Sequence, residues 1–137
     1  MEDNSLTTGE ALQWAFNTLS GALIPYARDE AEFILKCKRH ELFINARRTL
    51  TPEEAAILKE AIARRLLREP AQYIFGEAEF MGLPFKVTDA VLIPRPETEL
   101  LVKEAIKEAP SFGLDALTII DLCTGSGCIA VSTALGI

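Results

Sequence analysis

The sequence predicts an α+β protein in which an N-terminal helical bundle precedes a β-hairpin linker and the first β–α unit of a parallel sheet. Three observations predict this fold class. Apolar residues recur at helical spacing in the first half, aromatic residues flank a Gly/Pro break within residues 78–87, and a glycine-rich turn follows the apolar run 117–120. Such a run is typical of a strand buried on both faces of a parallel sheet. The length of 137 residues suggests one domain, or one small domain and a piece of another.

Helices account for the first part of the chain. Thr7 and Glu10 have the spacing of a capping box, which ties the first turn of a helix to the residue before it. Pro25 ends or interrupts this helix, and further helices are expected over residues 29–38 and 40–46. The apolar stripe of the first helix consists of Leu12, Ala15, Phe16, Leu19 and Leu23.

The fourth helix has the clearest start signal. Thr51 is the expected N-cap, Pro52 occupies the first helical position, and Glu54 completes a second capping box. Pro70 is expected to end this helix, because proline lacks the N–H that a helix interior requires. Four amphipathic helices with short connections form a small bundle. The inward face of the fourth helix is predicted to carry Ile57, Leu58, Ala61, Ile62 and Leu66.

The periodicity changes in the second half of the chain. Residues 78–87 predict a β-hairpin whose turn lies near Gly82, because aromatic residues stand on both sides of a Gly/Pro break. The remaining expected elements are a helix that contains Leu100, Leu101, Ala105 and Ile106, a loop at residues 110–113, a buried strand at residues 117–120 and a helix at residues 129–135.

Composition and charge exclude several classes of protein. Hydrophobic residues make up 49% of the chain, too many for intrinsic disorder, yet no run reaches the roughly 18 apolar residues that cross a bilayer. Residues 1–4 do not begin a secretory signal, so a cytoplasmic location without membrane contact is expected. The net charge of −6 argues against a direct nucleic-acid surface. The basic clusters Arg47-Arg48 and Arg64-Arg65-Arg68 are expected to be solvated helix faces, with docking of an acidic partner as the alternative.

The content of cysteine and histidine argues against a metal site. Three cysteines without a Cys-x-x-Cys motif, together with a single histidine, supply too few ligands for zinc and no disulfide framework. Cys37, Cys123 and Cys128 are therefore expected to be small buried hydrophobic residues, and no metal ligand is assigned. His40 lies near a helix start, where a solvent-facing or capping role is expected.

The segment Asp121-Leu122-Cys123-Thr124-Gly125-Ser126-Gly127 lies between the expected strand and helix, as a nucleotide-binding turn requires. ATP and GTP are disfavoured, because Cys128 stands where a P-loop carries Lys. A dinucleotide fingerprint stays open, since Ala130 is allowed at its third glycine position. Asp121 would sit poorly against a pyrophosphate and suits the cationic amino acid end of S-adenosylmethionine. The carboxylate of Asp121 thus favours S-adenosylmethionine over a dinucleotide as the ligand of this turn.

A second group of residues precedes the helix that contains Leu100. In Ile93-Pro94-Arg95-Pro96-Glu97-Thr98-Glu99, two prolines fix the backbone around the arginine, and both glutamates fall in the first helical turn. A well-capped helix start would explain the glutamates, because the helix dipole favours carboxylates there. An arginine held between prolines is preorganised, which suits an active-site wall made of Arg95, Pro96, Glu97 and Thr98.

Four segments in fixed order carry a resemblance to a known family. They are Glu69-Pro70-Ala71-Gln72-Tyr73-Ile74-Phe75-Gly76, Glu79-Phe80-Met81-Gly82-Leu83-Pro84-Phe85, Leu92-Ile93-Pro94-Arg95-Pro96-Glu97-Thr98-Glu99, and the glycine-rich loop from Asp121 to Gly127. The series resembles the HemK-type family, the peptide chain release factor glutamine methyltransferases. The resemblance implies a helical release-factor-docking domain (1–72), a β-hairpin linker (73–93) and the start of a Rossmann-like, S-adenosylmethionine-dependent methyltransferase domain (94–137).

The resemblance also implies an activity and a site. Such enzymes transfer a methyl group from S-adenosylmethionine to the side-chain amide nitrogen of the glutamine in the Gly-Gly-Gln motif of release factors. The Asn-Pro-Pro-Tyr motif that orients this amide in the family does not occur in the sequence, so no catalytic residue is assigned. Cys123 replaces the commoner first glycine, which is tolerable if its φ is negative. The donor-binding residues implied are Asp121, Cys123, Thr124, Gly125, Ser126 and Gly127.

Three expectations complete the interpretation. The chain is expected to be an N-terminal fragment that shows no measurable methyl transfer by itself. Two other functions stay open, namely a release-factor docking module without chemistry and a nicotinamide-dependent oxidoreductase. The apolar segment 117–122 is expected to promote self-association, because an unpaired apolar strand is an association hazard.

Overall fold

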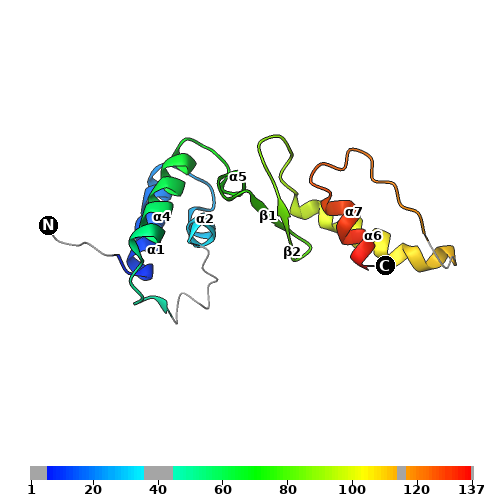
Figure 1. Cartoon of the computed structure of the whole chain (residues 1–137), viewed down its shortest axis with the longest axis horizontal. Coiled ribbons are helices and arrows are strands. Elements are labelled where there is room, and N and C mark those ends of the chain that lie inside the picture. Colours follow the sequence, from blue (N-terminus) through cyan, green and yellow to red (C-terminus); the bar gives the residue numbers. More distant parts are fainter. Residues whose placement is uncertain (1–5, 36–44, 114–116, 137) are drawn as a thin grey trace. The chain divides into compact units, whose positions relative to one another are not determined.

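The computed structural model describes residues 6–35, 45–113 and 117–136, and it divides the chain into two compact units, Met1–Ile74 and Phe75–Ile137 (Figure 1). Each unit is described by itself. The predicted positions of Cys37, His40 and most of the helix expected at residues 40–46 lie outside the described residues. The structure contains helices and a two-stranded sheet, in agreement with the predicted mixture of α and β elements.

The first unit is helical. It contains α1 (Thr8–Gly21), α2 (Ala27–Ile34) and α4 (Pro52–Leu66), and α5 (Ala71–Phe75) follows at its end. Both predicted capping boxes are confirmed. The Thr7 N–H donates to Glu10 Oε2 at 2.9 Å, and the Thr51 N–H donates to Glu54 Oε2 at 2.9 Å. These reciprocal bonds satisfy backbone groups that would otherwise lack partners at the helix starts.

The core of the helical unit follows the predicted apolar stripes, except that three of the predicted residues are exposed and Phe16 is half-buried. Leu23 is 83% exposed because α1 ends at Gly21 and the chain turns with a φ of +56° at Leu23. Ile57 is 56% exposed and Leu66 is also exposed, since a narrower face of α4 already meets the other helices. The buried residues of this core are Ala11, Leu12, Ala15, Leu19, Ile24, Ala27, Ala31, Ile34, Leu50, Leu58, Ala61 and Ile62.

Several helix ends differ from the prediction, and the helix expected at residues 29–38 is α2, which begins at Ala27 and ends at Ile34. Helix α1 ends four residues before Pro25, and α4 ends at Leu66 rather than at Pro70. Pro70 instead begins the next turn, because the N–H groups of Tyr73 and Ile74 both donate to its carbonyl oxygen, at 3.0 and 3.1 Å. Proline is tolerated at the start of a helical turn, because the N–H group that it lacks would have no partner there. Pro25 and Pro70 therefore come after helices that have already ended.

The basic clusters are largely engaged within the helical unit. Arg65 donates to both carboxylate oxygens of Glu30, at 2.8 and 3.1 Å, and Arg48 does the same with Glu54, at 2.9 and 3.1 Å. Arg64 pairs with Glu69, and Arg68 donates to the carbonyl of Ala22 at 2.9 Å near the end of α1. Arg65 and Arg68 thus join parts of different helices, a role that the charge pattern alone did not indicate, whereas Arg48 and Arg64 pair with acids close to them in the chain.

The carboxylates of the two capping boxes have lowered pKa values. The Thr7 backbone N–H, followed by the Thr7 hydroxyl, lowers the pKa of Glu10. Arg48, followed by the Thr51 N–H, lowers the pKa of Glu54. A carboxylate with a lower pKa in the folded state adds stability above its unfolded pKa, and this contribution is lost as the pH falls through the folded pKa.

The double substitution E10Q/E54Q is therefore expected to lower the free energy of unfolding at pH 7, with the difference from the unsubstituted chain shrinking below about pH 4. Urea unfolding at pH 7 and at pH 3 measures the difference. Glu53, an exposed carboxylate in the same helical turn as Glu54, gives the control E53Q, which should lower stability at pH 7 much less than the double substitution. An equal effect of the double substitution at both pH values would contradict the expectation.

The second unit begins with the predicted hairpin. Strand β1 (Glu77–Phe80) pairs antiparallel with β2 (Leu83–Lys86), with Ala78 opposite Phe85. Met81 and Gly82 form the two-residue turn with φ values of +52° and +74°. Two consecutive residues of positive φ match the twist of the flanking strands, so the turn expected near Gly82 is confirmed.

The other elements of the second unit are η1 (Pro96–Thr98), α6 (Glu99–Glu108), η2 (Ala109–Phe112) and α7 (Cys128–Gly136). The loop expected at residues 110–113 is mostly η2, because Gly113, with a φ of +61°, ends a short 3₁₀ turn there. A small core joins the hairpin to both long helices. Its buried members are Phe80, Phe85, Val102 and Cys128.

The strand predicted at residues 117–120 is not formed. Ile119 and Ile120 are exposed, and residues 117–120 make no backbone hydrogen bond to another described residue. The hairpin supplies the only sheet in the described ranges, so no parallel neighbour stands beside this segment. A strand requires such a neighbour for its N–H and C=O groups, which explains why the apolar run is extended but unpaired.

No helix in the described part of the chain combines the length and the apolar character that crossing a membrane requires.

Candidate functional site

The glycine-rich loop forms a tight turn between residues 117–120 and α7. The Thr124 hydroxyl donates to Asp121 Oδ2 at 2.9 Å, and the Gly127 N–H donates to the Thr124 carbonyl at 2.9 Å. These two bonds bring Asp121, Thr124 and Gly127 into one compact arrangement ahead of the first turn of α7. The first N–H groups of a helix lack partners within the helix, so this end of α7 can receive an acceptor group of a ligand.

Two glycines allow the turn. Gly125 has a φ of +57° and Gly127 a φ of +79°, both in the left-handed region that side chains disfavour. An added Cβ at Gly127 would meet no heavy atom within 4 Å, so the backbone, rather than a steric clash, sets the requirement for glycine there. The same open space leaves the peptide groups of the loop accessible.

The backbone of Cys123 differs from the expectation. Its φ is +63°, whereas the sequence argument required a negative value for a residue that replaces glycine. Cys123 is also exposed, so the expected burial is wrong for this cysteine and confirmed for Cys128, which lies in the core. Cys123 therefore occupies a left-handed backbone position that costs a residue with a Cβ about 1–2 kcal/mol.

The substitution C123G is expected to raise the free energy of unfolding of the second unit by about 1 kcal/mol, since glycine removes this backbone strain. Ser126, which does not have a positive φ, gives the matched control. S126G should lower stability by about 0.5–1 kcal/mol, because it adds only backbone freedom to the unfolded chain. Urea unfolding of both variants measures the contrast. Equal changes in the two variants would rule out strain at Cys123.

The predicted active-site wall precedes α6. Arg95 is extended, with φ −101° and ψ 135°, and its carbonyl accepts the Thr98 N–H at 3.0 Å. Arg95, Pro96 and Glu97 are exposed, and Thr98 is half-buried. The wall and the loop belong to elements that meet in the core, because Val102 of α6 packs with Cys128, the first residue of α7. The wall residues and the glycine-rich loop therefore lie in the same compact unit, Phe75–Ile137.

Glu99 has a contact that the sequence did not indicate. Its Oε1 accepts the N–H of Met81, in the hairpin turn, at 2.9 Å, and its Oε2 accepts from Lys103 at 3.2 Å. The Met81 N–H, followed by Lys103, lowers the pKa of Glu99. The helix dipole was the expected reason for an acid here, whereas the main partner lies 18 residues away in the chain. This partner of Glu99 can be identified only from the structure, because no sequence rule connects the two residues.

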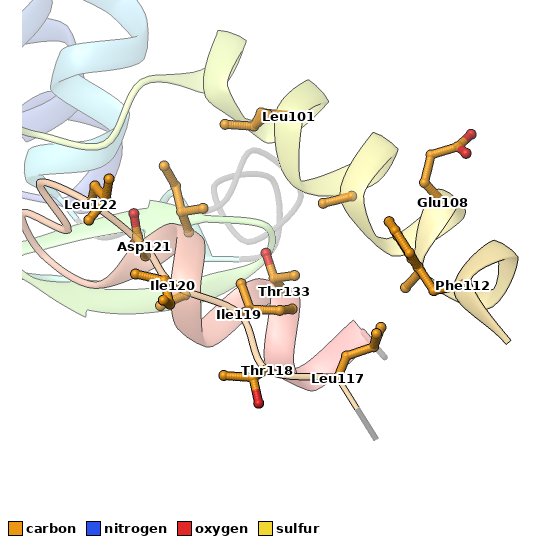
Figure 2. Close-up of a pocket in the computed structure, with 14 residues that line it drawn as sticks. Leu101, Glu108, Phe112, Leu117, Thr118, Ile119, Ile120, Asp121, Leu122 and Thr133 are labelled. Carbon is orange, nitrogen blue, oxygen red and sulfur yellow. The ribbon is translucent and has the colours of Figure 1, made fainter. Parts of the chain in front are cut away.

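An apolar groove of about 870 Å³ lies beside the loop. Figure 2 shows Leu101, Phe112 and Thr133 around the extended segment that runs from Leu117 to Leu122. Thr133 is buried, and its hydroxyl has no hydrogen-bond partner among the described residues. Apart from Glu108, Asp121 and two threonines, the lining is apolar, so the groove suits hydrophobic side chains rather than the polar groups of a nucleoside.

No group of three or more His, Cys, Asp or Glu side chains that could hold a metal ion is found in residues 6–35, 45–113 and 117–136.

Comparison with known proteins identifies relatives for most of the chain. Residues 10–76 match the PrmC N-terminal domain family. The chain is 42% identical to the release factor glutamine methyltransferase of Geobacter sulfurreducens over 132 residues, which are 93% of this chain and 45% of that relative. It is 45% identical to the protein of the same name from Koribacter versatilis over 133 residues, 94% of this chain and 47% of the relative.

The chain thus spans less than half the length of these two relatives. A third protein of that name, from Thermodesulfovibrio yellowstonii, is 48% identical over 83 residues, which are 61% of this chain and 30% of the relative. The resemblance seen in the sequence is confirmed: residues 10–76 match the PrmC N-terminal domain, and the chain is similar to proteins named release factor glutamine methyltransferase.

Proposed function

We propose that the chain is the N-terminal portion of an enzyme that methylates the glutamine of the Gly-Gly-Gln motif of peptide chain release factors, with S-adenosylmethionine as the methyl donor. The single observation that carries the proposal is the loop from Asp121 to Gly127, in which a carboxylate, two glycines of positive φ and a helix start lie together. The names of the relatives support the substrate class.

The proposed donor site assigns a role to each part of the loop. The Thr124 hydroxyl donates to Oδ2 of Asp121 and orients the carboxylate, which attracts the ammonium group of the methionine part of the donor. Gly125 and Gly127 let the backbone approach the ligand closely, and Cys123, Thr124 and Ser126 contribute further backbone and side-chain contacts. A sulfonium nucleoside needs no phosphate-binding lysine, in agreement with Cys128 at the helix start.

Methyl transfer to an amide nitrogen requires exact positioning, because this nitrogen is a poor nucleophile. Near-attack geometry then supplies a large part of the rate. We place the wall residues Arg95, Pro96, Glu97 and Thr98 beside the acceptor glutamine, whereas the Asn-Pro-Pro-Tyr motif that would orient the amide is not among the 137 residues. The chain by itself should therefore bind but not methylate. We also propose that the complete methyltransferase domain contains a Rossmann-like sheet and that the protein is cytoplasmic. Residues 117–122 are proposed to promote self-association.

The proposed division of the chain gives residues 1–72 the docking of the release factor, residues 73–93 the role of a linker and residues 94–137 the start of the methyltransferase domain. A chimera tests the whole proposal. Residues 1–137 replace the matching part of the Geobacter sulfurreducens relative, and the product is incubated with radiolabelled S-adenosylmethionine and a release factor. Label is expected on the Gly-Gly-Gln glutamine with the chimera and not with the 137-residue chain. Absence of label with an active parent relative would refute the proposal.

A docking module without chemistry is the second candidate, because the family match covers residues 10–76 and the helical unit forms its own core. Titration of residues 1–75 with a release factor distinguishes the two. Binding by this segment, combined with no binding of S-adenosylmethionine by the 137-residue chain, would favour the module.

A further inference from the structure

The hairpin turn and the start of α6 are joined by one side chain. Glu99 is the first residue of α6, and its Oε1 accepts the Met81 N–H at 2.9 Å. Met81 lies at the turn between β1 and β2, with a φ of +52°, so its N–H points away from the two-strand ladder and needs another acceptor. The Glu99 carboxylate supplies that acceptor.

Two further contacts fix this link. Lys103, one turn along α6, donates to Glu99 Oε2 at 3.2 Å and holds the carboxylate from the other side. Val102 of α6 is fully buried against Phe80 and Phe85 of the hairpin. The hydrogen bond therefore lies at the edge of an apolar contact and sets the rotation and the axial position of α6 relative to the hairpin, which apolar packing by itself defines less sharply.

Glu99 directly follows the wall residues in the chain, so its bond to Met81 also affects where the wall lies. The wall residues Arg95–Thr98 come directly before Glu99, and Thr98 is itself bonded to the Arg95 carbonyl at 3.0 Å. Three of the four wall residues are exposed, and the segment leads directly into α6, so its orientation depends on where α6 begins. The helix that follows the donor loop packs on the same core through Cys128.

We propose that Glu99 is a positioning residue, whose bond to the Met81 N–H holds the wall Arg95–Thr98 in register with the glycine-rich loop; this role rests on the proposed donor site. Glu99 touches neither donor nor acceptor in this scheme. It acts through the hairpin turn, which makes the hairpin part of the site's support rather than a simple connection between two units.

Substitutions of Glu99 in the 137-residue chain test the proposal by NMR. In E99A, the Met81 amide should exchange with solvent at least about tenfold faster, which corresponds to the loss of one hydrogen bond to a charged group. The amide resonances of Arg95, Glu97 and Thr98 should shift in the same variant. E99Q keeps an oxygen acceptor and should restore both signals. E108A removes an exposed carboxylate at the other end of α6 and should change neither the Met81 exchange nor the wall resonances.

Calorimetry with S-adenosylmethionine separates the two proposals. E99A is expected to bind the donor about tenfold more weakly than the unsubstituted chain, with E99Q close to normal. Unchanged Met81 exchange in E99A, or wall resonances that move equally in E99A and E108A, would overturn the positioning role. Failure of the unsubstituted chain to bind the donor would instead overturn the donor site, while the NMR signals still decide whether Glu99 holds the wall.

Discussion

The substitution D121N is expected to weaken the binding of S-adenosylmethionine by roughly 10- to 100-fold. A hydrogen bond to a charged group contributes about 1.5–3 kcal/mol, and asparagine removes the charge while it keeps the size of the side chain. The Thr124 hydroxyl donates to Oδ2 of Asp121 at 2.9 Å and orients the carboxylate, whose remaining lone pairs are available to the donor's ammonium group. The neutral amide keeps an acceptor there but loses most of the attraction for a cation.

Calorimetric titration of the 137-residue chain with S-adenosylmethionine measures this effect. D89N, at an exposed aspartate that follows β2, makes the same chemical change outside the loop and should leave the affinity unchanged. T124V removes the hydroxyl that orients the Asp121 carboxylate and is expected to have an intermediate effect. Equal affinities of D121N and D89N would show that the carboxylate does not bind the donor.

The second large effect is expected on stability. Phe80 is 1% exposed and meets Phe85 edge to face, with the ring centroids 6.3 Å apart and the planes at 77°. Removal of a buried phenylalanine side chain leaves a cavity and costs about 3–5 kcal/mol. F80A should therefore lower the free energy of unfolding of the second unit by this amount, and it should also loosen the loop, because Cys128 lies in the same core.

Urea unfolding combined with hydrogen exchange of the β1 amides measures the loss in the second unit. F112A is the matched control, since Phe112 lies in η2 and is 65% exposed. Substitution of an exposed side chain usually changes stability by less than about 0.5 kcal/mol. A loss below about 1 kcal/mol in F80A would mean that the small core does not hold this unit together.

Local signals in the sequence predicted local structure well. The capping boxes at Thr7 and Thr51 form as expected, because each uses residues three apart in the chain. The hairpin turn also forms where expected, since Gly82 takes a positive φ that its type allows. In these cases the atoms that determine the structure lie within a few residues of one another, so a short stretch of sequence contains the necessary information.

Features that depend on distant partners were missed. The apolar run 117–120 was predicted to be a strand, but no neighbouring strand is present in the described ranges to pair with it. Ile57 follows the apolar pattern of α4 and is nevertheless exposed, because the other helices contact a narrower face. Periodicity shows which residues are able to be buried, and the rest of the fold decides which of them are.

In the candidate site, too, local features could be predicted from the sequence, whereas contacts between distant residues could not. The composition of the donor loop could be predicted, including the two glycines, but the left-handed backbone of Cys123 could not, because cysteine seldom adopts it. The bond between Glu99 and Met81 joins two segments that no spacing rule connects. Whether the loop holds S-adenosylmethionine stays a prediction that the titration of Asp121 variants addresses.

The pairing of Arg65 with Glu30 constrains how the helical unit can diverge. Two of the three nitrogens of the planar Arg65 guanidinium group, Nε and Nη2, face the two oxygens of the Glu30 carboxylate, at 2.8 and 3.1 Å, and both side chains are mostly shielded from water. Lysine offers the same charge without the fork, so it would satisfy one oxygen and leave the other short of a partner. Evolutionary drift at position 65 is thus limited by shape as well as by charge, and an exchange that keeps the overall charge balance would still alter how α2 and α4 are joined.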